Sequence, residues 1–258
     1  MSDCKYIAVK IESPIGFIEL NRPDVLNALN RPMVREIVET LEAFDRNDDV
    51  KVIVIHGKGR AFAAGADINE MANDDPISLD LLNQFADWDR IALIKKPIIG
   101  AVHGFALGGG FELALCCDII FAAEGTEFGF PEINLGVMPG AGGTQRLTKL
   151  MGRTKALEWL WRGENMTAKE ALHYGVINRI VGKEVLLEET IRFAKTIAKQ
   201  PALSLRFIKE AVNKAVDYSL YEGMQYERKN FYLLFASCDQ KEGMQAFIEK
   251  RKPNFEGR

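Results

Sequence analysis

Residues 97–113 read PIIGAVHGFALGGGFEL, and this stretch decides the fold. Residues 97–102 form an apolar run rich in Ile and Val, as a buried β-strand does. Four glycines follow in the next eight residues, and a helical segment then begins with Glu112 in its first turn. Glycines at a helix N-terminus leave backbone N–H groups open to a ligand, and the helix dipole favours negative charge there. The stretch therefore predicts a strand–turn–helix unit with an anion-binding turn.

The same pattern occurs on both sides of this unit. Residues 52–55 and 118–123 are further β-branched or apolar runs that lead into glycine-bearing turns, which predicts parallel strand pairing. Residues 6–12 and 16–20 alternate around a Ser-Pro pair, as the two strands of a hairpin do. Helical spacing is clear at 32–46 and 78–94. These elements predict an α/β fold.

The C-terminal third differs from this core. From about residue 183 no strand signal remains, and residues 203–216 and 220–236 carry apolar stripes at helical spacing. We predict an α/β core with the active site over residues 1–195 and an all-helical module over residues 196–258. The helices of this module are rich in apolar and aromatic residues, which favours packing on a partner or on the core.

Composition excludes several classes of partner. The 258 residues are 47% hydrophobic and carry a net charge of −3, so nothing global attracts nucleic acid or an anionic membrane. The longest apolar runs are shorter than the roughly 20 residues of a membrane span. The N-terminus has no signal-peptide pattern, and the four cysteines form no CxxC pair, which is typical of a reducing compartment. We expect a cytoplasmic protein.

Motif searches exclude most common catalytic sites. The glycine cluster at 140–145 ends in Gln where a dinucleotide fingerprint needs Gly, and no P-loop, GxSxG or HExxH motif occurs. The three histidines are isolated, and no Cys, His and Asp group has metal-ligand spacing, so we expect no metal. Cys116 and Cys117 lie in an apolar stretch without a nearby His, which favours core packing over nucleophilic catalysis.

A second glycine-bearing turn and two acids remain. Residues 61–67 (AFAAGAD) follow a strand and open a helix, so two turns could each aim one N–H at a single oxygen. Glu112 and Glu132 both lie among apolar residues, which is unusual unless they are paired or functional. Two carboxylates beside one carbonyl can serve as proton donor and acceptor. Spacing alone is equally consistent with purely structural roles. Glu112 would then only interact with the helix dipole, and Glu132 would only cap a helix.

Five sequence blocks occur in order along the chain: FAAGADI (62–68), GGGFEL (108–113), CDI (117–119), PEI (131–133) and PGAGGTQRL (139–147). Together they resemble the crotonase superfamily, and its enoyl-CoA hydratase branch in particular. LNRP (20–23), NAL (27–29), KEGM (241–244) and AFIEKR (246–251) extend the resemblance over nearly the whole chain. It implies a spiral of repeated ββα units with a C-terminal helical oligomerisation module. It also implies a hydro-lyase that reversibly adds water across the C2=C3 bond of 2-trans-enoyl-CoA, in fatty-acid or related acyl-CoA degradation.

The resemblance also implies roles for particular residues. Ala66 and Gly109 would supply the oxyanion-hole amides, Glu112 would activate the water that attacks C3, and Glu132 would exchange the proton at C2. CoA would contact Leu26, Ala28, Ala64, Asp67 and Ile68, together with Phe231 and Lys250 of a neighbouring subunit. CoA is part of the substrate, so no separate cofactor is expected. The family's members are trimers or dimers of trimers, and we expect the same assembly here.

The acyl group is not named by the sequence. Met71, Phe85, Trp88 and Trp161 are candidates to line an acyl pocket, although such residues at helical spacing are often core. Asn69 stands where relatives often carry Lys, which leaves one CoA-phosphate contact open. Phe130 stands where many short-chain hydratases carry Gln, which leaves the preferred chain length open.

Other members of the superfamily remain as alternatives. They are an enoyl-CoA isomerase, a branched-chain (methylglutaconyl-type) hydratase and a 3-hydroxybutyryl-CoA dehydratase. The presence of both Glu112 and Glu132 favours hydration, because relatives with only one of the two acids tend to isomerise double bonds or catalyse other enolate chemistry. An RNA-binding relative is disfavoured, since residues 35–46 (REIVETLEAFDR) contain more acid than base and RNA binding needs a basic stripe.

Overall fold

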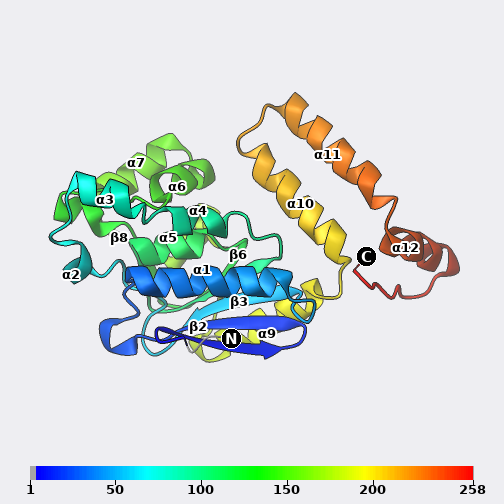
Figure 1. Cartoon of the computed structure of the whole chain (residues 1–258), viewed down its shortest axis with the longest axis horizontal. Helices are drawn as coiled ribbons and strands as arrows, with labels where there is room; N and C mark the ends of the chain where they lie inside the picture. Colours follow the sequence, from blue (N-terminus) through cyan, green and yellow to red (C-terminus); the bar gives the residue numbers. More distant parts are fainter. Residues whose placement is uncertain (1–3, 258) are drawn as a thin grey trace.

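The computed structural model describes residues 4–257, so the outer ends of the two expected units, residues 1–3 and 258, lie outside it. Two sheets form the core (Figure 1). The first has the strand order β1-β2-β3-β4-β6-β9, and the second has the order β5-β7-β8. The strands of the first sheet are β1 (Ile7–Glu12), β2 (Ile15–Leu20), β3 (Val52–Gly57), β4 (Ile98–Val102), β6 (Ile119–Ala123) and β9 (Arg179–Val181). Those of the second are β5 (Phe105–Leu107), β7 (Glu127–Gly129) and β8 (Asn165–Thr167).

The expected strand pairing is confirmed. β1 and β2 form the antiparallel hairpin, and β2, β3, β4, β6 and β9 pair parallel. The central strand β4 is apolar throughout and fully buried, because helices cover both faces of the sheet. The short strands β5, β7, β8 and β9 are absent from the sequence-based prediction. Each has only three residues, too few to show alternation.

The chain winds as a spiral between the two sheets. β4 belongs to the large sheet and β5, which follows it, to the small one; α5 (Gly109–Leu115) comes next. β6 and β7 repeat this step, and the 3₁₀ helix η2 (Pro131–Leu135) and α6 (Gly143–Met151) follow them. The expected spiral of ββα units is therefore confirmed. It places the starts of α5 and η2, with their acids, side by side because β5 and β7 are paired.

Two helices cover opposite faces of the large sheet. α1 (Arg31–Arg46) confirms the predicted helix at 32–46, and its N-cap Asn30 side chain accepts the N–H of Met33 at 2.9 Å. α9 (Leu186–Ile197) packs on β3 and β4 from the other side, and Ala194 and Ala198 are fully enclosed there. The core thus includes all of α9, and the helical module begins only after it.

The predicted single helix at 78–94 is wrong. The structure has two short helices, α3 (Pro76–Leu82) and α4 (Ala86–Ile91), and the chain turns at Asn83 with φ 42°. Asn adopts this left-handed conformation more readily than other non-glycine residues, so it ends α3. The remaining core elements are η1 (Pro23–Val25), α2 (Ile68–Met71), α7 (Arg153–Arg162), α8 (Ala168–His173) and η3 (Lys183–Val185).

The C-terminal module consists of α10 (Ala202–Ala215), α11 (Leu220–Leu234) and α12 (Cys238–Glu249). α10 and α11 pack on each other and extend away from the sheets, with α12 beyond them (Figure 1). Phe247 is 85% exposed. Other large apolar side chains left exposed on α11 and α12 are Leu220, Tyr221, Met224, Phe231, Tyr232, Leu233, Met244 and Ile248. Among residues 4–257, no helix has the length and apolar content that crossing a bilayer requires.

Candidate active site

Ala66 and Gly109 lie close together where the loop after β3 meets the start of α5. The loop hydrogen-bonds to β5 through Ala63, whose N–H donates to Phe105 O at 3.1 Å and whose carbonyl accepts Leu107 N–H at 3.0 Å. A Cβ on Gly109 would stand 3.6 Å from the nitrogen of Ala66. Within the described chain, neither the Ala66 nor the Gly109 N–H donates a backbone hydrogen bond. The two amides are therefore available to one acceptor between them.

Glycine is required at two neighbouring positions. Gly108 has φ 48°, and a Cβ there would stand 3.0 Å from Oε1 of Glu132. A Cβ on Gly110 would stand 2.1 Å from the carbonyl oxygen of Ala63, so a side chain at 110 would push the loop away. The glycine run thus permits a close approach of three backbone segments and one carboxyl group.

Glu112 lies in the first turn of α5, as expected, and is 4% exposed. Its Oε1 accepts the N–H groups of Ala141 and Gly143 at 2.7 and 2.8 Å. Burial raises the pKa of this carboxyl, while the two amides and Arg146 oppose the rise. These donors favour the ionised form, so Glu112 suits the role of a base.

Glu132 has a contrasting environment on η2. Its Oε2 is buried and has no hydrogen-bond partner among the described residues. Burial raises the pKa of Glu132 to about 7, its own backbone N–H opposes the rise, and the charge of Glu112 adds to it. A carboxyl with this pKa is partly protonated at neutral pH and can donate a proton. The two acids therefore differ in hydrogen bonding, since amides hold Glu112 while an oxygen of Glu132 has no partner among the described residues.

Phe130 belongs to the core beneath this site. It is buried and stacks on Phe111 with ring centroids 4.7 Å apart. Its ring also lies against Gly143, where a Cβ would meet it at 2.6 Å. Phe130 therefore supports the loop whose amides hold Glu112, and adds no polar group beside Glu132.

The loops expected to contact CoA lie together. Ala64 N–H donates to Leu26 O at 3.0 Å, and Asp67 N–H donates to Leu29 O at 2.9 Å. Asp67 also pairs with Arg22 at 3.0 Å. Ala28 and Ile68 lie on the same two segments, so five of the expected positions converge beside Ala66.

The two remaining CoA positions lie elsewhere in this chain. Phe231 is on α11 with its ring edge-on to Phe235, and Lys250 ends α12 with φ 56°. The adjacent Arg251 is paired with Glu242 and Glu249.

Two of the four acyl-pocket candidates line a cavity. This cavity of about 950 Å³ lies between α4, α6 and α10, and Phe85 and Trp88 contribute to its wall. Phe85 contacts Gly140, beside the amide of Ala141 that holds Glu112. Met71 lies on α2 outside this cavity, and Trp161 is 68% exposed on α7. Burial raises the pKa of both Cys116 and Cys117, which line the same cavity, so neither is an activated nucleophile.

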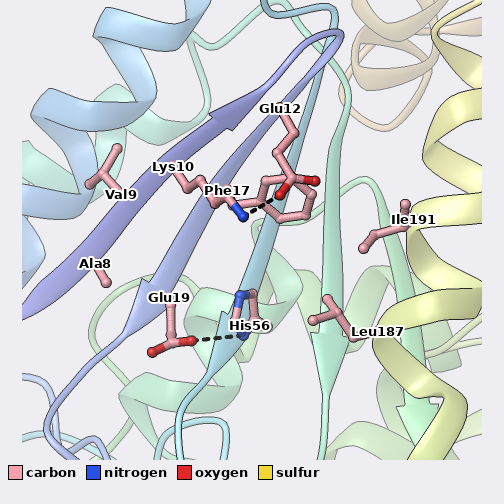
Figure 2. Close-up of a pocket in the computed structure, with 9 residues that line it drawn as sticks. All are labelled: Ala8, Val9, Lys10, Glu12, Phe17, Glu19, His56, Leu187 and Ile191. Atoms are coloured by element: carbon pink, nitrogen blue, oxygen red, sulfur yellow. Dashed lines mark ion pairs between the residues drawn. The ribbon is translucent and has the colours of Figure 1, made fainter.

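A second cavity has neither Glu112 nor Glu132 in its wall. Its volume is about 300 Å³. Figure 2 shows the residues that line it, on β1, β2, β3 and α9. His56 lies there, 3.9 Å from Glu19, and burial lowers its pKa. His103 is held by the carbonyl of Gly59 at 3.0 Å. Among residues 4–257, no three His, Cys, Asp or Glu side chains are grouped as a metal site.

Sequence reasoning missed two kinds of functional residue. Ala141 and Gly143 act through backbone amides, and their only signal is the glycine-rich block in which they lie. Asn27 is a fully buried polar residue with φ 56°. Its signal is an Asn followed by two apolar residues after a Pro turn, which is weak without a structure.

Comparisons of sequence and structure with known proteins agree with one another. The family model for enoyl-CoA hydratase/isomerase matches residues 10–258. A crystal structure from Geobacillus kaustophilus described as "Enoyl-CoA Hydrates Subunit I" has a TM-score of 0.98 and 68% identity, and covers 100% of both chains. A probable enoyl-CoA hydratase of Mycobacterium tuberculosis is 46% identical, covering 96% of this chain and 97% of its own. The mitochondrial enoyl-CoA hydratase of Pongo abelii is 46% identical, covering 93% and 83%.

Proposed function

Because this chain belongs to the enoyl-CoA hydratase/isomerase family, we propose that it is a hydro-lyase that reversibly adds water to a 2-trans-enoyl-CoA. One observation carries the assignment to particular residues. Two amides hold Glu112, and Glu132 has a pKa of about 7 and a buried oxygen without a partner among residues 4–257. Both lie near the Ala66 and Gly109 N–H groups, which donate no backbone hydrogen bond within those residues. Full-length relatives at 46% identity are named for the same reaction.

The proposed reaction uses all four groups. The thioester carbonyl accepts hydrogen bonds from the Ala66 and Gly109 N–H groups, which stabilise the negative charge that develops on its oxygen. Glu112 takes one proton from water while the water oxygen bonds to C3, and the C2=C3 electrons move to C2 and the carbonyl. Glu132 gives its proton to C2. The product is the 3-hydroxyacyl thioester, and proton transfer between the acids or through solvent restores both.

Product identity tests this function. A panel of 2-trans-enoyl-CoA esters that varies chain length and branching should yield 3-hydroxyacyl-CoA products, followed by loss of the enoyl absorbance and by mass spectrometry. Hydration adds 18 mass units, whereas isomerisation adds none. Conversion of these esters to 3-enoyl isomers without hydration would assign the isomerase alternative instead. The same panel separates short, branched and 3-hydroxybutyryl substrates.

We further propose that the C-terminal module builds a homotrimer or a dimer of trimers and brings Phe231 and Lys250 to a neighbour's CoA. Support comes from the large apolar side chains that α11 and α12 leave exposed in the single chain. A cytoplasmic location is proposed from the cysteine pattern and the reducing compartment it favours. The pathway proposed is fatty-acid or related acyl-CoA degradation, with no cofactor beyond the CoA of the substrate.

Phe247→Glu tests the assembly without touching the core. This side chain is 85% exposed, so a charge there should leave the fold intact and disrupt a contact between chains. Light scattering should show three or six chains of 28.9 kDa for the wild type and a smaller species for the variant, with reduced activity. Lys241→Glu, which introduces the same carboxylate on the same helix at an exposed and already charged position, is the control. An unchanged mass for Phe247→Glu would argue against α12 as an interface.

A further inference from the structure

A buried asparagine fixes the loop before α1. The side chain of Asn27 is 0% exposed and is fully hydrogen-bonded. Its Oδ1 accepts the N–H of Arg22 at 2.8 Å, and its Nδ2 donates to the carbonyls of Lys58 and Ala61 at 2.9 and 2.8 Å. One amide group therefore joins the loop of residues 22–29 to the segment that follows β3.

The conformation of this loop needs such support. Leu26 and Asn27 have φ values of 52° and 56°, two consecutive non-glycine residues in the left-handed region. Such residues persist only where their surroundings hold them in place. The Asn27 N–H closes the turn onto Arg22 O at 2.9 Å, and the Arg22 guanidinium reaches Ala28 O and Asp67.

The fixed loop in turn orients the oxyanion segment. Leu29 forms a parallel bridge with Ala66: its N–H donates to Gly65 O at 2.8 Å, and its carbonyl accepts Asp67 N–H at 2.9 Å. Because amides alternate in direction along an extended segment, the Ala66 N–H points away from Leu29. Gly109 lies near the same nitrogen, with a Cβ position 3.6 Å from it.

We propose that Asn27 is a positioning residue for the oxyanion hole, acting through residues 26–29 on the direction of the Ala66 N–H. The inference rests on the proposed function, because it assumes that a thioester carbonyl binds at these amides. Asn27 touches neither the acids nor the carbonyl. Its contribution is to hold one donor within the small tolerance that transition-state stabilisation requires.

The residue type is demanded by three requirements at one position. The side chain must accept one hydrogen bond, donate two, and occupy a left-handed backbone position. Asp keeps the shape and the acceptor but directs an oxygen at the carbonyls of Lys58 and Ala61. Gly keeps the backbone freedom and removes the side chain. Asn27→Asp and Asn27→Gly therefore remove the same two donors in different ways.

The experiment combines kinetics with a direct report on the carbonyl. A saturated thioester, [1-¹³C]butanoyl-CoA, cannot be hydrated, and isotope-edited infrared spectroscopy reads its C=O stretch when bound. In the wild type, two N–H donors should lower this frequency from its value in water. Both Asn27 variants should return it toward that value and lower kcat by about 10²-fold, since misplacement by about 1 Å can cost that much. KM should change less than kcat.

Thr190→Val is the matched control. Thr190 is also 0% exposed and donates one hydrogen bond, to Leu186 O at 2.8 Å, but it lies on α9 away from the site. This variant should lose thermal stability while keeping kcat and the carbonyl frequency.

Three outcomes would overturn the inference. The first is a folded Asn27 variant with the wild-type frequency and kcat. The second is a change in KM without a change in kcat in the Asn27 variants, which would show that residues 22–29 only contact CoA. The third is a loss of kcat that Thr190→Val shares at equal stability. If the wild type itself shows no frequency shift, the oxyanion site of the proposed function fails, a result distinct from these three.

Discussion

Glu112→Gln and Glu132→Gln are each expected to lower kcat by about 10²- to 10⁴-fold, the usual scale for loss of a general acid or base. Glutamine keeps the volume of each side chain, and at 112 its Oε1 can still accept the Ala141 and Gly143 amides. It cannot take a proton from water or give one to C2. KM should change little, because neither carboxyl is proposed to bind CoA. Steady-state kinetics with a short enoyl-CoA measure both constants.

The pH profile separates the two acids. Glu132 must be protonated to donate, so activity in the hydration direction should fall as pH rises through about 7. Glu112 must be ionised, so activity should also fall at low pH, below its raised pKa. The residual activity of Glu132→Gln should no longer fall as pH rises through about 7, while its fall at low pH should remain. Exposed Glu124→Gln is the control and should leave both limbs. Near-normal turnover in either active-site variant would rule out the two-acid mechanism.

Gly109→Ala is expected to abolish most turnover in a folded protein. The new methyl group would stand 3.6 Å from the Ala66 nitrogen and 3.9 Å from Cδ1 of Leu29, which is ordinary contact with the fold. It would nevertheless occupy the space where the carbonyl oxygen must sit between the two amides. Loss of one oxyanion donor costs about 3 kcal/mol of transition-state stabilisation, or about 10²-fold in kcat, and here both are obstructed. Kinetics and the melting temperature should be measured together.

The comparison with other glycines makes the result specific. Gly182→Ala adds a methyl group with only ordinary contacts, at 3.7 and 3.8 Å, and should leave activity unchanged. Gly110→Ala is unsuitable as a control, since its Cβ would stand 2.1 Å from Ala63 O and displace the loop. Wild-type turnover in a stable Gly109→Ala protein would remove this amide from the mechanism.

Local patterns were sufficient for much of the fold. The β-branched runs at 52–55 and 118–123 and the glycine turns predicted parallel strands because period and composition depend on neighbours in sequence. The three-residue strands were not predicted, because strands such as β5 and β7 depend on pairing with segments distant in the sequence. The break at Asn83 was missed because helical spacing continues across it.

The candidate site was likewise predictable only in part. The sequence by itself determined which residues are candidates: Glu112 and Glu132 stood out as acids among apolar neighbours, and the glycines predicted open amides beside them. Only the tertiary structure decided the surroundings of these residues. Glu112 is held by amides 29 and 31 residues away, Glu132 has a pKa of about 7, and Asn27 ties residues 22–29 to the loop after β3. A pKa shift and an amide's direction depend on desolvation and on contacts distant in sequence, and these come into being only when the chain packs.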